Sequence, residues 1–233
     1  MTISRHPNIL ALTQNKANYP SRLLDLFDPP KTLYIYGAIN LLQRPMIAIV
    51  GSRLASPEGI NNATLFSQAL SRAGFLIISG MARGIDGAAH WGALRLGPEH
   101  STVAVCGTGL DVTYPPEHAG LAQSIRERGL LISELAFGDG PKAFHFPRRN
   151  RLIAALCIGV VVIEAAEKSG SLITARLASE LGREVFALPG SIRKPFSRGC
   201  HQLIQQGAKL AQRPEDVLDE LQIWQKPHLK AFK

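Results

Sequence analysis

The sequence predicts an α/β fold in which a doubly wound, mostly parallel sheet carries helices on both faces. Two observations lead to this class. From residue 45 onward, short continuous apolar runs recur, as in strands that are buried on both faces of a sheet. Segments with helical periodicity separate these runs, and helices are the usual connections between parallel strands. With 233 residues, of which 45% are hydrophobic, the chain can bury the core that such a sheet requires.

The elements follow in order along the chain. Residues 1–44 form a lead-in rather than a domain of their own, because prolines interrupt this segment and its apolar runs are short. We expect the lead-in to pack on the main domain. This lead-in should hold a short helix near residues 21–27 and a small edge strand at 33–36. The main domain spans residues 45–222, and residues 223–233 form a C-terminal tail. The expected strands of the main sheet are residues 46–50, 75–78, 103–106, 130–132, 159–163 and 185–188. The expected helices are residues 58–73, 85–96, 117–128, 149–157, 171–182, 199–207 and 214–222.

Small residues follow nearly all of the expected strands. Gly51-Ser52-Arg53 comes after the first strand, and Arg83 lies in the glycine-containing turn after the second. Lys168 precedes Ser169-Gly170-Ser171 after the fifth. Because the carboxyl ends of parallel strands meet at one edge of a sheet, these turns should lie together, where helix N-termini and cations attract anions. The alternatives are that the glycines only permit tight turns and that Lys168 is solvated.

The segment from Gly140 to Arg151 has the composition of a contact with nucleic acid. Between residues 141 and 163 there are four Lys/Arg and no Asp/Glu. Clustered cations persist best beside an external polyanion, and Phe144 and Phe146 offer faces on which unpaired bases stack. The alternative is that the arginines begin a solvated helix and the phenylalanines face the core. The candidate binding residues of this segment are Lys142, Phe146, Arg148, Arg149, Asn150 and Arg151.

The formal net charge of +8 is concentrated in two stretches of the chain. Residues 141–163 and 191–213 together hold nine of the 26 Lys/Arg and none of the 18 Asp/Glu, which favours a polyanionic partner. No run reaches the ~18 apolar residues of a membrane span, so we expect no membrane partner. The three cysteines lie far apart without metal-ligand spacing, which indicates a reducing cytoplasm. We therefore expect neither a metal nor a cofactor.

The acidic and histidine residues do not form a catalytic grouping in the sequence. Asp86 and Asp111 occupy positions where carboxylates cap helices or hold turns, and Glu164 ends a buried strand. His90 and Trp91 fall in the middle of an expected helix, where packing is the usual role. Without paired carboxylates or a Ser/His/Asp set, we expect no catalytic residue and no enzymatic activity.

Six blocks of sequence point to one family when they are taken together. They are GSR (51–53), SGMARGID (79–86), GTGLD (107–111), FPRRNR (146–151), SGSLITA (169–175) and LPG (188–190). In this order and at these separations, over about residues 18–222, the chain resembles the DprA/Smf family of bacterial DNA-processing proteins. Many members also have an N-terminal helical domain and a C-terminal winged-helix-like domain, and we expect this chain to be the central domain alone.

The resemblance implies an extended Rossmann-like fold and a homodimer that binds single-stranded DNA. It also implies that the protein protects incoming DNA and loads the RecA recombinase during natural transformation. By position, Arg53 would meet phosphate and Phe146 would stack near a base. The resemblance further implies that a basic pocket is lined by Arg149, Arg151 and Lys168, with Ser169, Gly170 and Ser171 as donors. The chain departs from the family at residues 199–202, where the asparagine that usually precedes the Leu-Ile pair is missing.

Two other functions were weighed against this one. Nucleoside-monophosphate phosphoribohydrolases have a similar sheet, and their characteristic motif is a Pro-Gly-Gly turn followed by a catalytic glutamate. In this chain residues 189–194 hold no second glycine and no acid. A dinucleotide-dependent oxidoreductase requires G-x-G-x-x-G after the first strand, and residues 51–56 lack that spacing. Single-strand DNA binding is the interpretation that we carry forward, with the phosphoribohydrolase as the alternative.

Overall fold

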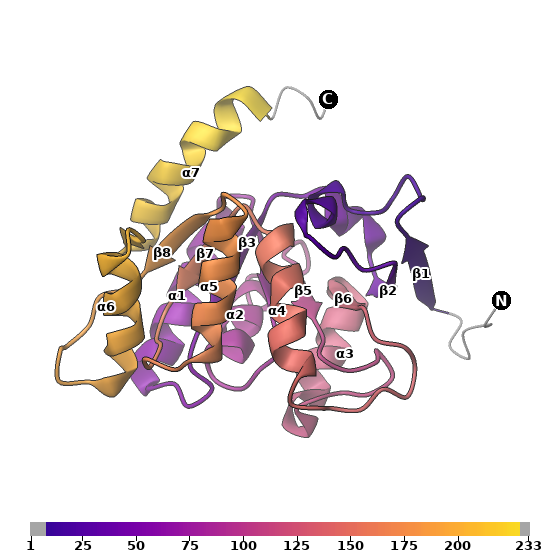
Figure 1. Cartoon of the computed structure of the whole chain (residues 1–233), viewed down its shortest axis with the longest axis horizontal. Helices are drawn as coiled ribbons and strands as arrows, with labels where there is room; N and C mark the ends of the chain where they lie inside the picture. Colours follow the sequence, from indigo (N-terminus) through magenta and orange to yellow (C-terminus); the bar gives the residue numbers. More distant parts are fainter. Residues whose placement is uncertain (1–7, 229–233) are drawn as a thin grey trace.

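The computed structural model describes residues 8–228, with side chains through Leu221. In this part of the chain nine strands form one sheet in the order β1-β2-β6-β5-β4-β3-β7-β8-β9. The strands from β6 to β9 in this order are all parallel, whereas β2 pairs antiparallel with both β1 and β6. Helices lie on both sides of the sheet (Figure 1). The predicted doubly wound, mostly parallel α/β fold is confirmed.

The six predicted strands of the main sheet are all present, each within one residue of its expected bounds. Their continuous apolar sequences reflect burial on both faces, since every residue of β3 to β7 is buried. The strands are β1 (Ile9–Thr13), β2 (Thr32–Gly37), β3 (Met46–Val50), β4 (Leu76–Ser79), β5 (Thr102–Val105), β6 (Leu130–Ser133), β7 (Gly159–Val162), β8 (Glu184–Ala187) and β9 (Lys209–Leu210). The α-helices are α1 (Pro57–Arg72), α2 (Ile85–Leu94), α3 (Ala119–Arg128), α4 (His145–Leu156), α5 (Gly170–Glu180), α6 (Arg198–Gln205) and α7 (Pro214–His228).

Two layers of helices divide the core. Successive side chains of a strand point to opposite faces, so Ile47 and Ile49 of β3 pack with α1, α2 and α7. Ala48 and Val50 of the same strand pack with α4, α5 and α6. A third cluster under α3 includes Ala104 of β5. Figure 1 shows α4, α5 and α6 in front of the sheet, with α1, α2 and α3 behind it.

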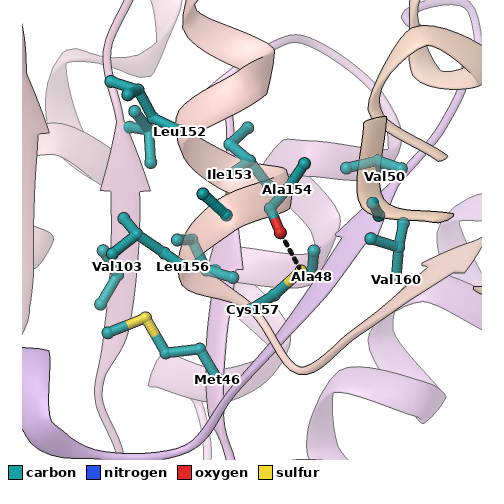
Figure 2. Close-up of a cluster of buried hydrophobic side chains, with 14 of the residues drawn as sticks. Met46, Ala48, Val50, Val103, Leu152, Ile153, Ala154, Leu156, Cys157 and Val160 are labelled. Atoms are coloured by element: carbon teal, nitrogen blue, oxygen red, sulfur yellow. Dashed lines mark hydrogen bonds between the residues drawn. The ribbon is translucent and has the colours of Figure 1, made fainter. Parts of the chain in front are cut away.

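The apolar second half of α4 fixes this helix on the sheet. Leu152, Ile153 and Leu156 are at most 3% exposed and lie against strand residues that include Met46 and Val103 (Figure 2). Each fully buried side chain of this size contributes about 1.5–3 kcal/mol to folding. The helix ends at Cys157, whose thiol donates to the Ala154 carbonyl at 3.4 Å. This packing holds the first turn of α4, with its phenylalanine and arginines, over the carboxyl ends of the strands.

Several boundaries differ from the prediction. The strand expected at the sheet edge, β2, is an inner strand, because β1 pairs with its outer side. The expected helix near residues 21–27 is a single 3-10 segment, Ser21–Asp25. Helix α4 begins at His145 rather than at residue 149, since Pro147 falls in the first turn, where its missing N–H costs nothing. Helix α7 continues to His228, beyond the predicted end at 222, and residues 229–233 of the predicted tail lie outside the described residues.

The strand order reverses between β3 and β7. From β3 the chain proceeds outward through β4, β5 and β6, and α4 then leads back to β7 on the other side of β3. In an open α/β sheet the helices on either side of such a reversal diverge and leave a crevice at the carboxyl ends of the strands. The turns after β3 and β7 and the first turn of α4 therefore meet at this point.

Candidate nucleic-acid interface

A cleft of about 520 Å³ opens at the strand-order reversal. Its walls are the turn after β3 (Gly51 to Leu54), the first turn of α4 and the turn into α5 (Lys168 to Ser171). The turn after β3 needs a glycine, because a Cβ at Gly51 would lie 2.7 Å from Ile85 and 2.8 Å from the Glu164 carbonyl oxygen. The size falls in the range of pockets that hold one small ligand or part of a polymer.

Two of the predicted cations lie free at this cleft. Arg53 and Lys168 are both exposed, and neither forms an ion pair with any described carboxylate. The guanidinium carbon of Arg53 lies 5.4 Å from the centre of the Phe146 ring, within cation–π range. Strands β3 and β7 are adjacent, and the cleft is lined both by Arg53, which follows β3, and by Lys168, which follows β7. Their positive charge is available for an anion from solvent.

Phe146 supplies the aromatic surface of the cleft. Its ring is half-buried and lies 5.3 Å from the ring of Tyr114, measured between centres. The ring also packs closely on Gly107, where a Cβ would lie 2.8 Å from a ring carbon. These neighbours fix the orientation of the ring. Phe144, by contrast, is 63% exposed and stacks edge-on against His145.

The N-terminus of α5 forms the second wall. Ser169 is its N-cap, and its hydroxyl accepts from the Ser171 amide at 3.4 Å and lies 2.7 Å from the Ser171 hydroxyl. Gly170 is exposed, and a Cβ there would meet nothing within 4 Å. The unpaired amides of a helix start attract anions, and a glycine lets them approach closely. Residues 168–171 therefore line the cleft at a helix start, and anion binding by them stays a prediction.

Arg149 lines the cleft but is not a free cation. Its side chain is buried, and Nη1 donates to the Gly80 carbonyl at 2.5 Å and to the Val105 carbonyl. Burial lowers the pKa of its guanidinium, while the charge of Asp86 opposes that shift. The structure thus gives Arg149 a role in joining the ends of β4 and β5. The prediction of Arg149 as a binding residue in a basic pocket did not anticipate this burial.

Carboxylates neutralise most of the other predicted cations. Glu134, directly after β6, accepts from Arg151 at 2.5 Å and lies 3.4 Å from Arg148. Arg151 also donates to the Asp28 carbonyl at 2.8 Å, so it ties the lead-in to α4. Neither arginine lines the cleft. The expectation of an unpaired cationic loop is wrong at these positions, because it considered only the carboxylates near in sequence.

The same correction applies to Arg83 and to the second basic stretch. Arg83 pairs with Glu117, and Lys142 is exposed without lining the cleft. In residues 191–213, four of the five bases lie within 4.0 Å of a carboxylate. These pairs are Lys194 with Glu58, Arg198 with Glu167, Lys209 with Glu184 and Glu220, and Arg213 with Asp216. Exposed pairs of this kind contribute little to stability, but they reduce the field that a polyanion experiences.

The acidic residues near the strand ends accept hydrogen bonds from backbone amides. Asp86 accepts from the amides of Gly80 at 3.1 Å and Ala82 at 3.3 Å. Asp111 accepts from the Gly138 amide at 3.0 Å. Glu164 accepts from the Ser56 amide at 2.9 Å and from the Ser56 hydroxyl, which fixes the start of α1. These bonds agree with the structural roles predicted for all three.

Neither a metal site nor a membrane span emerges from the described residues. Among residues 8–228, His, Cys, Asp and Glu nowhere gather in threes close enough to hold a metal ion. In the same part of the chain, no helix combines the length and the apolar character that crossing a bilayer requires. His90 is buried in α2, with Nδ1 2.7 Å from the Thr102 hydroxyl, and thus belongs to the packing of the core.

Comparison with known proteins gives consistent matches over nearly the whole chain. It is 48% identical to DNA processing protein DprA of Streptococcus pneumoniae, over 88% of this chain and 71% of that protein. A solved structure of DprA from that organism superposes with a TM-score of 0.88 and covers 92% of this chain and 75% of the other. The chain is also 46% identical to Protein Smf of Escherichia coli, over 93% of its length and 58% of that protein.

A further solved structure, which describes the single-stranded DNA binding mode of DNA processing protein A from Helicobacter pylori, superposes with a TM-score of 0.83. It is 32% identical and covers 93% of this chain and 96% of that one. The family model described as DNA recombination-mediator protein A matches residues 10–222, which include every element that forms the cleft. The chain therefore belongs to the DNA recombination-mediator protein A family.

Proposed function

We propose that the chain binds single-stranded DNA in the cleft between β3 and β7. The observation that carries this proposal is that two cations without a described ion-pair partner, Arg53 and Lys168, line one cleft together with Phe146, over whose ring Arg53 lies. A sugar-phosphate backbone would pass between the cations. One phosphate would meet the amides and hydroxyls at the start of α5.

The aromatic ring gives the cleft a preference for unpaired bases. A base that stacks on Phe146 must leave its own stack, which costs a single strand little and a duplex much more. Stacking on the ring also places the base beside Arg53, whose guanidinium lies over the same side chain. The contacts are with phosphate and with the face of a base, so they carry little sequence information.

The cellular role follows the family resemblance. We propose that the protein acts in the cytoplasm as a homodimer, protects incoming DNA during natural transformation and loads the RecA recombinase onto the bound strand. The absence of a free carboxylate supports binding without catalysis: Asp86 is the one acid that lines the cleft among the described residues, and it is committed to two backbone amides. Sites of the phosphoribohydrolase type need an acid free to act.

A direct test compares one sequence in single-stranded and duplex form. Fluorescence anisotropy with a labelled oligonucleotide should show tighter binding of the single strand, by at least tenfold at 100 mM salt. Equal affinity for both forms would refute the proposal. Incubation with nucleoside monophosphates should release no free base, and light scattering should report two chains per particle. The rate of RecA filament assembly on the same strand, with and without the protein, tests the loading role.

A further inference from the structure

We infer that Arg149 and Asn150 are positioning residues that hold the two walls of the cleft in the arrangement that binds DNA. This inference rests on the proposed function. It replaces a direct phosphate contact by Arg149 with a chain of hydrogen bonds that runs from the ends of β4 and β5, through α4, to the first turn of α5. The chain links the wall that carries Phe146 to the wall that carries Lys168.

The first link anchors α4 to the sheet. Arg149 donates through Nη1 to the carbonyl of Gly80, directly after β4, and to the carbonyl of Val105, the last residue of β5. The side chain is 4% exposed, and a Cβ at Gly80 would lie 2.5 Å from its Nη2 atom. Glycine is therefore required for the guanidinium to reach this place. A buried cation held by carbonyls fixes the helix that carries it, because any shift would leave charged and polar groups unpaired.

Gly80 is held from a second side. Its amide donates to Asp86 at 3.1 Å, while its carbonyl accepts from Arg149. Asp86 lies in the first turn of α2 and also accepts from the Ala82 amide at 3.3 Å. The backbone of one residue after β4 is thus held by two buried side chains, Asp86 at its amide and Arg149 at its carbonyl. The anchor of the chain is rigid for this reason.

The second link passes from α4 to α5. Arg149 donates through Nε to Oδ1 of Asn150 at 3.1 Å, and Asn150 donates through Nδ2 to the Gly170 carbonyl at 3.2 Å. A carboxamide is required at position 150, because this link needs an acceptor on one side and a donor on the other. Gly170 is the first residue of α5 and follows the N-cap Ser169, which in turn follows Lys168. The guanidinium thereby sets the orientation of the amide, and the amide sets the position of the helix start.

The functional consequence is preorganisation. Affinity falls when a site must be ordered during binding, even if every group that touches the ligand is still present. Loss of one link should therefore weaken DNA binding without removing a phosphate contact. This separates positioning from direct contact, because the dependence of affinity on salt counts neutralised phosphates and does not report preorganisation.

The experiment uses Arg149→Lys and Asn150→Ala in the full chain, with Arg53→Ala and Arg176→Ala for comparison. Lysine keeps the charge but cannot serve both strand carbonyls and Asn150 at once. We expect Arg149→Lys to bind a single-stranded oligonucleotide about tenfold more weakly, and Asn150→Ala about fivefold more weakly, each with an unchanged salt slope. Arg53→Ala should instead lower the slope. Arg176, an exposed residue of α5 outside the binding cleft, should change neither.

Amide hydrogen exchange without DNA separates positioning from direct contact, because the loss of a phosphate contact alone would leave the exchange rates unchanged. In Asn150→Ala the amides of residues 170–174 should exchange about fivefold faster, while those of Arg53→Ala should match the wild type. Wild-type affinity in Arg149→Lys, or unchanged exchange at the start of α5 in Asn150→Ala, would overturn the inference. Because exchange is measured without ligand, these outcomes are distinct from a failure of the chain to bind DNA at all.

Discussion

Arg53→Ala is the substitution that tests the cleft most directly. The side chain is exposed, has no described ion-pair partner and stands over Phe146, so its removal leaves the core and the hydrogen bonds of Arg149 in place. The turn that carries it is held independently, by the Leu54 amide that donates to the Ser52 hydroxyl at 3.1 Å and by the Ser52 amide that donates to the Glu164 carbonyl at 2.8 Å. The variant should therefore fold as the wild type does.

The size of the effect follows from the number of free cations. For a single strand, the logarithm of the affinity falls with the logarithm of the salt concentration by about 0.7 for each neutralised phosphate. Two cleft cations, Arg53 and Lys168, give a slope of about −1.4, and loss of one gives about −0.7. Between 50 and 200 mM salt, the wild type should thus lose affinity about sevenfold and the variant about threefold.

Fluorescence anisotropy at four salt concentrations between 50 and 400 mM measures both slopes. Arg176→Ala is the matched control, because it removes the same charge from an exposed position of α5 that lies outside the binding cleft. Its slope should equal that of the wild type. Identical slopes in wild type and Arg53→Ala would refute the assignment of a phosphate to Arg53. A wild-type slope steeper than about −3 would show that the paired arginines open to bind phosphate as well.

Three further predictions concern the ring, the paired arginines and a buried histidine. Phe146→Leu should weaken single-strand binding by about 1–3 kcal/mol with an unchanged salt slope, measured by the same titration. Glu134→Gln should lower the free energy of unfolding by about 1–3 kcal/mol in denaturant titrations, because Arg148 and Arg151 lose their anion; equal stability would contradict the pairing. Burial lowers the pKa of His90 to about 3. Below about pH 6.5 this histidine therefore binds a proton in the unfolded chain but not in the folded chain. Stability should therefore fall as the pH drops from about 6.5 toward 3, and His90→Gln should show a shallower fall.

The sheet was predictable because its signal is local. Strands buried on both faces read as continuous apolar runs, and all six such runs became strands within one residue of their expected bounds. The two strands that were missed carry weaker signals. β1 has only two buried residues among its five, and β9 has two residues in all. Their pairing depends on partners that are distant in the chain, which no local pattern reveals.

The position of the site was predictable for a topological reason. Parallel strands end at one edge of a sheet, so the turns at Arg53 and Lys168 had to meet wherever their strands are neighbours. The helix at the cleft was predicted to begin at residue 149, whereas α4 begins at His145 and includes Pro147 in its first turn. Phe146 and residues 168–171 line the cleft, and their contacts with DNA stay a prediction.

The sequence by itself determined the α/β class, the order of the strands along the chain and the presence of small and cationic residues at the strand ends. Only the tertiary structure decided which cations are free. Arg151 meets Glu134, Lys194 meets Glu58 across 136 positions of sequence, and Arg149 is buried against two strand ends. Whether a cation is paired depends on distances of a few ångströms between segments that folding brings together, whereas the apolar pattern of a strand or helix lies within its own segment of sequence.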